Sequence, residues 1–314
     1  MFEIKIYDAT CKAQWDSFVA KARNSSFLFY RDYMEYHSDR FDDFSLMAYH
    51  KGKLMALLPA NLEGEVLYSH KGLTYGGWVI DIQITSMKMC HLFDQLNVFL
   101  SERGIKKVVY KPLPWIYHSC PSEEDLYALT NVCHAKLSTR HISSSIDLRR
   151  RIKFAEARKS GIRKAYANHL KVEELSADEL HSFWDVLENN LADKYHAHPV
   201  HSLKEISALM KHFPDNIRLF VAKKDNATLG GTLLYINKEV VHTQYISANQ
   251  EGKKCGALDI LFESILNMDW SPAHYFDFGK SSDGNGEILN ESLIFQKEGF
   301  GGRGVCYDWY EWEL

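Results

Sequence analysis

The sequence lacks the marks of several protein classes. Its six cysteines are widely scattered, and none stands in a CxxC pair or at the Cys/His spacing of a zinc site. No apolar run approaches the roughly 20 residues that a membrane helix needs. The opening segment, MFEIKIYDAT, has no basic region followed by an apolar stretch, as a secretory signal would have. We therefore expect free thiols, no metal, no membrane span and a cytoplasmic location.

A strong charge of one sign is also missing. The 37 Lys and Arg residues nearly balance the 41 Asp and Glu residues, for a net charge of −4. This balance argues against nucleic acid as a bulk electrostatic partner, although a local basic patch stays open. No GxSxG elbow and no Ser-His-Asp order occur, so a covalent acyl-enzyme has little support.

The pattern of elements is repeated along the chain. At 314 residues, of which 46% are hydrophobic, the chain is long enough for two domains with cores of their own. Each half predicts a strand, two helices, an antiparallel meander, a helix, a strand, a helix and a strand. The basic run Arg149-Arg150-Arg151 separates the halves, which we place at 1–149 and 150–314. Strands and helices intermix, so we expect a mixed α/β fold with a partly antiparallel sheet.

The second half contains the most informative stretch. An alternating strand, Val240–Ser247, leads through the Gly/Lys segment 249–257 into an apolar helix that we place at Gly256–Met268. This arrangement presents backbone N–H groups to a phosphate or carbonyl oxygen. An ordinary strand-to-helix turn is the plainer interpretation. The expected donor-binding residues are Ile246, Ser247, Ala248, Asn249, Gly252, Lys253, Lys254, Gly256 and Ala257.

These features resemble a known family. The order of elements in each half resembles the GNAT acyltransferase fold, and two such halves in tandem resemble the FemAB-like transferases, including a group found with cell-envelope polysaccharide genes. Gly252 and Gly256 match the acyl-CoA loop of GNAT proteins, whereas Glu251 stands where Arg or Gln is common and Lys254 replaces a Gly. The ending FQKEGFGG resembles that of FemAB-like chains. The resemblance implies N-acyl transfer, with acyl-CoA or aminoacyl-tRNA as the donor.

Three residues are candidates for catalysis: Asp277, His242 and Tyr245. Asp277 follows Phe276 on the predicted strand Tyr275–Phe278, and either Asp277 or His242 could take the proton of an attacking amine. The strand period of two predicts that His242 and Gln244 share one face, and that Thr243 and Tyr245 share the other. Tyr245 could donate a proton to a departing thiolate. The plainer interpretation is a capping or ion-paired Asp and structural His and Tyr residues.

The acceptor is expected to be bound by three groups of residues. The segment between the first two helices of the second half is expected to cover the acceptor, and its HxHxxH spacing suggests a metal only weakly, because no acidic partner is evident. In the first half, a Gly-rich segment and a lysine are expected to line a cleft between the halves, where ligands often bind. The predicted residues are Tyr195, His196 and His198; Gly279, Lys280 and Ser281; and His70, Tyr75 and Lys111.

Three functions remain open at this point. The first is transfer of an acyl group from acyl-CoA to the amine of a small acceptor, an amino sugar or amino acid in cell-envelope biosynthesis, by direct attack. The second is FemAB-like transfer from aminoacyl-tRNA to a peptidoglycan-type precursor, which the basic segment 149–164 favours. The third is a ligand-binding protein without catalysis, which the departures at Glu251 and Lys254 favour.

Overall fold

The structure is a computed structural model that describes residues 1–195 and 197–314, with the side chains of Lys194 and Tyr195 left out. The chain forms two compact units. Unit 1 comprises residues 1–142, 282–289 and 305–314, and unit 2 comprises residues 143–281 and 290–304. The units therefore divide at 142/143, whereas the sequence led us to expect 149/150, and the end of the chain belongs to unit 1. Strand β17 (Arg303–Glu313) explains this, because Tyr310 pairs with Tyr110 of unit 1.

Unit 1 contains a four-stranded sheet, part of an 11-stranded sheet and the separate pair β15-β16. The strand orders of the first two are β1-β3-β4-β7 and β9-β17-β8-β6-β5-β2, and β6 and β8 run parallel. The strands are β1 (Phe2–Ile6), β2 (Asp42–Asp43), β3 (Leu46–His50), β4 (Lys53–Leu58), β5 (Asn61–Glu63), β6 (Val66–Tyr68), β7 (Val79–Ile80), β8 (Lys107–Tyr110) and the start of β9 (Lys136–Asp147), with the small pair β15 (Ser282–Asp283) and β16 (Ile288–Leu289). The helices are α1 (Lys12–Lys21), α2 (Arg31–Met34), α3 (Ser86–Ser101) and α4 (Glu124–Asn131).

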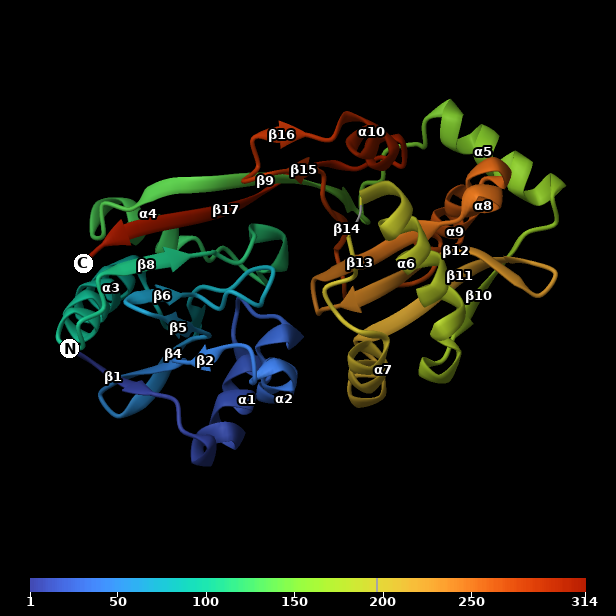
Figure 1. The fold of residues 1–314 in the computed structure, drawn as a ribbon. Coiled ribbons are helices and arrows are strands. Elements are labelled where there is room, and N and C mark those ends of the chain that lie inside the picture. The colour runs from blue at the N-terminus through green and yellow to red at the C-terminus, as the bar shows by residue number, and fades with distance from the viewer. Residues whose placement is uncertain (196) are drawn as a thin grey trace. The chain divides into compact units, whose positions relative to one another are not determined.

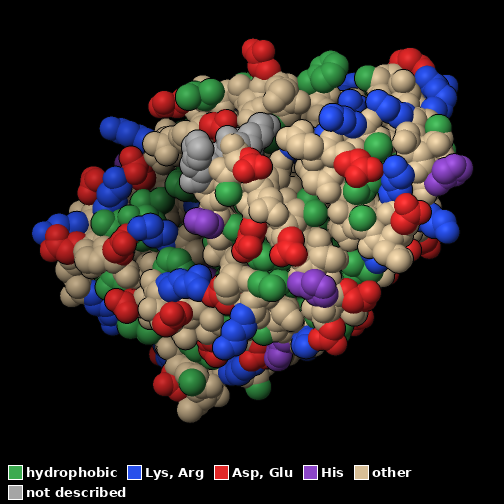
Figure 2. All heavy atoms as spheres, turned by 45° about the vertical axis from the view of Figure 1, so that its right-hand side comes forward, with side chains coloured by type: hydrophobic (Ala, Val, Ile, Leu, Met, Phe, Trp, Pro, Cys, Tyr) green, Lys and Arg blue, Asp and Glu red, His purple; other side chains and the backbone are tan. Residues whose placement is uncertain are grey.

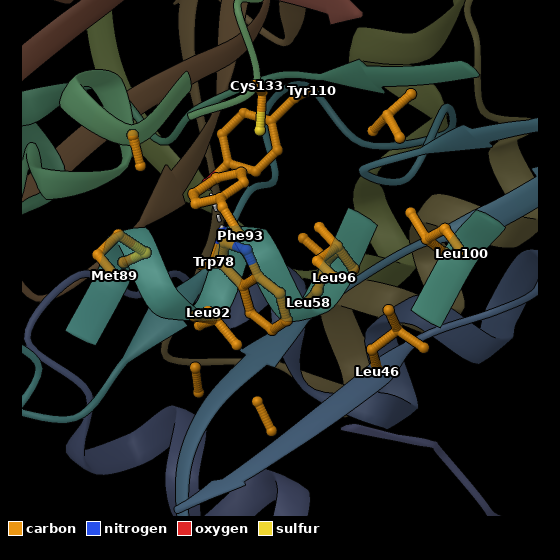
Figure 3. Packing of buried hydrophobic residues seen from close by; sticks show 14 of the residues in the cluster. Leu46, Leu58, Trp78, Met89, Leu92, Phe93, Leu96, Leu100, Tyr110 and Cys133 are labelled. Atoms are coloured by element: carbon orange, nitrogen blue, oxygen red, sulfur yellow. Dashed lines mark hydrogen bonds between the residues drawn. The ribbon is translucent and has the colours of Figure 1, made fainter. Parts of the chain in front are cut away.

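The core of unit 1 is built around α3. The amphipathic pattern of this region predicts a helix over Thr85–Arg103, and α3 buries the expected face, which includes Phe93. Figure 3 shows these side chains beside Trp78 and Tyr110. The Tyr110 hydroxyl accepts the Trp78 backbone N–H at 2.7 Å and donates to Asp125 at 2.8 Å. A buried hydroxyl is thereby satisfied in both roles, which makes this polar centre compatible with an apolar core.

Unit 2 holds one sheet with helices on both faces. The strand order is β10-β11-β12-β13-β14-β9. Figure 1 shows α5, α8 and α9 grouped together, with α6 crossing the sheet in front of it. The strands are β10 (Lys171–Leu175), β11 (Ile217–Lys224), β12 (Ala227–Ile236), β13 (Val240–Ala248) and β14 (Tyr275–Lys280). The helices are α5 (Glu156–Ala167), α6 (His181–Tyr195), α7 (Leu203–His212), α8 (Gln250–Cys255), α9 (Ala257–Leu266) and α10 (Glu291–Gly299).

Strands β13 and β14 are the parallel pair in unit 2, and they part early. Their register begins at Val240↔Tyr275 and ends at His242↔Asp277. Beyond that point β13 continues to Ala248, and β14 continues to Lys280. The carboxyl ends of two parallel strands that separate are the usual place for a ligand in an open α/β sheet. The point of separation falls on two of the residues singled out in the sequence.

The surface carries mixed charges. On the face drawn in Figure 2, Lys and Arg side chains are interspersed with Asp and Glu, and neither sign forms a continuous field. This agrees with the net charge of −4. Within the described residues, no helix combines the length and the apolar character needed to cross a membrane.

Candidate functional site

A β-bulge in β13 decides which side chains share the site. The register pairs around it are Tyr235↔His242, Leu234↔Thr243 and Leu233↔Tyr245. Gln244 is the extra residue, so the alternation of faces skips one position there. His242 and Tyr245 consequently lie opposite residues of β12 that are two apart, which puts both side chains on one face of the sheet. The prediction that they lie on opposite faces is wrong, because a strict period of two does not allow for a bulge.

His242 and Asp277 form a buried pair at the point where β13 and β14 separate. Asp277 is fully buried and faces away from Phe276 and Phe278, which pack in the apolar core. Its carboxylate accepts hydrogen bonds from Ser143 Oγ at 2.5 Å, from Nδ1 of His242 at 2.7 Å and from the backbone N–H of Gly279 at 3.3 Å. These three donors offset the cost of burying the charge.

The pairing also sets the tautomer of His242. A carboxylate can only accept, so Nδ1 of the ring carries a proton, and in the neutral ring Nε2 is then the nitrogen with the lone pair. The Nε2 side of the ring lies beside Gly279, where an added Cβ would stand 3.3 Å from Cε1 and 3.8 Å from Nε2. Nε2 of His242 therefore lies next to the end of β14.

Tyr245 has a histidine partner that the sequence reasoning did not select. Its hydroxyl lies 2.6 Å from Nδ1 of His201 and accepts the His201 backbone N–H at 3.3 Å. The ring also packs edge-on against Trp184 of α6. Burial raises the pKa of Tyr245, so the phenol keeps its proton at neutral pH. His201 ends the HxHxxH run, and that spacing was the signal for it in the sequence.

The other predicted residues of that segment have a weaker structural basis. His198 is exposed to solvent. Tyr195 ends α6, but its side chain lies outside the described part of the chain, as does the whole of His196. Their predicted role in covering the acceptor therefore stays a prediction. Across the described residues, no group of three or more His, Cys, Asp or Glu side chains could hold a metal ion.

Lys297 of α10 is a second residue that the sequence reasoning missed. Its side chain is buried, and Nζ donates to the backbone carbonyls of Gly279 at 2.8 Å and Lys280 at 2.7 Å. Burial lowers the pKa of Lys297 to about 8, against the opposing charge of Asp277. The signal for Lys297 in the sequence was the FQKEGFGG ending, which was noted for resemblance alone.

The predicted segment 279–281 is shaped by this lysine. Gly279 has φ +72°, in the left-handed region that favours glycine, and it turns the end of β14. Lys280 is half-buried, and burial lowers its pKa. Ser281 is buried with its hydroxyl unbonded within the described residues. Its place directly after β14 keeps it a candidate for contact with a ligand.

The three candidates of unit 1 lie in its interior. Lys111 is buried, with Nζ donating to the Leu73 carbonyl at 2.5 Å. Tyr75 is buried against Tyr117. His70 stacks on His37, and burial lowers its pKa to about 3. Buried contacts of this kind are typical of structural residues. The expectation that His70, Tyr75 and Lys111 bind the acceptor stays a prediction, and their low exposure to solvent does not support it.

The expected donor loop is not a loop. Residues Gln250–Cys255 form the short helix α8, and Gly256 ends it with φ +78°. The N–H of Gly252 bonds to the Asn249 side chain at 2.8 Å, and the N–H of Gly256 bonds to the Gly252 carbonyl. Lys253 Nζ donates to the side chain of Asn190. The N–H groups of Gly252, Lys253 and Gly256 are therefore already bonded within the protein, and the residues fit a coenzyme A diphosphate poorly.

The strand residues before α8 are also engaged. Ser247 and Ala248 are buried, and Ser247 donates to the Val186 carbonyl of α6 at 3.3 Å. Ile246 is half-buried and packs against the core on the α9 side, and the N-terminal residue of α9, Ala257, is fully buried. Their predicted contact with the donor stays a prediction.

Comparison with known proteins agrees with this architecture. Residues 147–285 match the model of the acetyltransferase (GNAT) domain. Over 99% of this chain and 97% of the other, the structure is similar to that of FemX, with a TM-score of 0.70 and 12% identity. A tandem GNAT protein from the clavulanic acid biosynthesis pathway aligns with a TM-score of 0.53 and 12% identity, over 100% of this chain and 98% of that one.

L-PGS from Bacillus licheniformis aligns as well, with a TM-score of 0.61 and 10% identity over 98% of this chain and 92% of that one. The search among curated proteins gave no match. These likenesses confirm the predicted mixed α/β fold with two GNAT-like halves. Residues 147–285 match the GNAT domain, and the chain as a whole has the tandem-GNAT, FemAB-like fold.

Proposed function

We propose that this protein transfers an acyl group to the amine of a small acceptor, by direct attack of the amine on the acyl carbonyl. The observation that carries the proposal is the His242–Asp277 pair, which stands where β13 and β14 separate and shares its face of the sheet with Tyr245. A base and an acid on one face meet the two proton requirements of acyl transfer.

In this scheme His242 is the general base. Nε2 takes a proton from the attacking nitrogen as the new C–N bond forms, and Asp277 stabilises the imidazolium that results. Asp277 already accepts from three donors in a fully buried position, so we assign it to holding the ring and not to removing the proton itself. The two candidate bases of the sequence thereby receive different roles.

Tyr245 is the proposed general acid. As the bond between the carbonyl carbon and its thiol or hydroxyl carrier breaks, the phenol gives its proton to the departing sulfur or oxygen. The proton taken up by His242 is then released to solvent, and Tyr245 regains a proton from solvent. The raised pKa of Tyr245 keeps the phenol protonated, so that it can donate a proton. Backbone N–H groups at the end of β13, past its last pairing with β14, are the proposed partners of the carbonyl oxygen.

Aminoacyl transfer from charged tRNA is the second candidate. It is favoured by the poor fit of α8 to a coenzyme A diphosphate, since N–H groups of α8 are bonded within the protein. In aminoacyl-tRNA the acyl group is carried as an ester, and the donor has no diphosphate that must be bound near the reacting carbon. The basic segment 149–164 gives it only partial support, because Arg158 pairs with Asp259 and Arg163 pairs with Glu156. An amino sugar or amino acid acceptor, a place in cell-envelope biosynthesis and a cytoplasmic location remain parts of the proposal.

The test is a transfer assay on the full chain with acetyl-CoA and with aminoacyl-tRNA, against a panel of amino sugars and amino acids. The variant Asp277→Asn should lower kcat by about 100-fold or more, because the ring of His242 loses its charged partner. The matched control is Glu239→Gln, since Glu239 bonds to His274 at 2.9 Å beside the other end of β14. Equal turnover in wild type and Asp277→Asn would refute the assignment, and no transfer from either donor would favour a binding protein.

A further inference from the structure

We infer that the segment 249–257 is closed by backbone contacts with α5 and β12 and does not hold the diphosphate of a coenzyme A donor. We call this closed segment the sealed joint. The inference concerns the donor of the proposed acyl transfer and so rests on that function. In a diphosphate site, glycines leave room for the phosphate oxygens beside free amides. Here the room beside each glycine is taken by the protein itself.

The two glycines that suggested a donor loop are packing residues. A Cβ on Gly256 would lie 2.3 Å from the carbonyl oxygen of Gly161 in α5, and a Cβ on Gly252 would lie 2.2 Å from the carbonyl oxygen of Leu229 in β12. Both obstacles are backbone atoms, which cannot move aside as a side-chain tip does. Glycine is therefore required at these positions by contact between elements, independently of any ligand.

Helix α5 covers the start of α9 with its backbone. Gly161 lies in the middle of α5, and a Cβ there would stand 2.0 Å from Oδ2 of Asp259 in the first turn of α9. Figure 1 shows α5 beside α8 and α9. The N-terminus of α9 is the place where a phosphate would gain most from the helix dipole, and α5 occupies that space.

The two buried charges at the start of α9 are already paired with each other. Asp259 supplies a carboxylate to the first turn of α9, where it complements the helix dipole itself. Arg158 of α5 neutralises it through an ion pair of 2.8 Å, with both side chains largely buried. A diphosphate would have to displace this pair and would meet the carboxylate. The donor must therefore be recognised through its acyl-bearing end at β13 and β14, and not through a diphosphate at α8 and α9.

Calorimetric titration of the full chain with coenzyme A and with acetyl-CoA tests the inference. The loop variant is Lys253→Ala/Lys254→Ala, and the control is Lys204→Ala/Lys211→Ala on α7; all four lysines are exposed. We expect either no saturable binding up to about 1 mM or an affinity that changes less than about threefold in the loop variant. A larger loss confined to the loop variant would overturn the inference. Neither outcome decides the proposed function, which rests on Asp277→Asn and the donor panel.

A second test addresses the packing. Alanine in place of glycine inside a helix normally raises the unfolding temperature. We expect Gly161→Ala to lower it instead, by about 3 °C or more, while Ser160→Ala on the exposed side of α5 leaves it nearly unchanged. The loss should be smaller when Asp259→Ala is also present, because that change removes the obstructing carboxylate. An increase in the unfolding temperature for Gly161→Ala would contradict the sealed joint.

Discussion

At the residue scale, the site is made of pairs in which one partner fixes the other. Asp277 sets the tautomer of His242, and His201 holds the hydroxyl of Tyr245. The sequence predicted Asp277, His242 and Tyr245 as separate candidates, because their side chains are of types suited to proton transfer. It could not predict their partners, because Ser143 and His201 reach the site from distant parts of the chain.

His70 provides a prediction about stability at low pH. Burial lowers its pKa from 6.5 to about 3, with the charges of Lys111 and Arg31 acting in the same direction. The unfolded chain takes up the proton as pH falls below 6.5 and the folded chain does not, so stability present at pH 7 is lost on acidification. Between pH 7 and pH 5 we expect a loss of about 2 kcal/mol from this residue.

Urea unfolding at both pH values measures this loss. The variant His70→Asn removes the titrating ring and keeps a residue type that accepts positive φ, which is +62° at this position. Its stability should fall less than that of the wild type between the two pH values. His169→Asn is the control, because His169 has φ +59° but is exposed. A pH dependence that is the same in His70→Asn and wild type would contradict this role for His70.

At the scale of elements, the structure differs from the sequence prediction in two details. Because of the bulge at Gln244, Tyr245 lies on the same face of the sheet as His242. The bulge depends on pairing with β12, so the local sequence pattern does not predict it. The donor segment was read as a loop because of Gly252 and Gly256, yet Asn249 caps a helix there. Glycine spacing alone does not distinguish a ligand cradle from a close contact between helices.

The bulge leads to a prediction for Tyr245. If the hydroxyl protonates the leaving group, Tyr245→Phe should lower kcat by about 10- to 100-fold. The loss should shrink with acyl donors whose leaving group is more acidic, because these need less help from a proton donor. Turnover measured with a donor series provides the comparison. Tyr275→Phe at the start of β14 serves as the control, and a uniform loss across the series would argue against an acid role.

At the scale of the whole molecule, the tandem order of elements could be predicted and the division into units could not. Hydrophobic periodicity gave the helices and strands of both halves, as α3 and β13 illustrate. The end of the chain belongs to unit 1 because β17 pairs with β8, although β17 is the last strand in the sequence. Pairing over such a distance has no local signal.

This connectivity predicts that damage to the last strand unfolds the first unit. Trp312 of β17 is buried beside Phe93 of α3, and its Nε1 donates to Asn97 at 3.1 Å. Trp312→Ala should cost about 3 kcal/mol or more, and hydrogen exchange should show lost protection in α3 with α9 unchanged. Trp115→Ala, at an exposed tryptophan, is the control. Loss of protection in α9 alone would contradict the observed pairing.

The most direct test of the account is the turnover of His242→Gln compared with that of His274→Gln. His274 forms a similar pair with Glu239 just before β14, away from the point of strand separation, so it controls for the loss of a paired histidine. With the donor and acceptor that support transfer by the wild type, we predict a fall in kcat of about 100-fold or more for His242→Gln and less than about threefold for His274→Gln. Equal turnover in the two variants would contradict the assignment of His242 as the base.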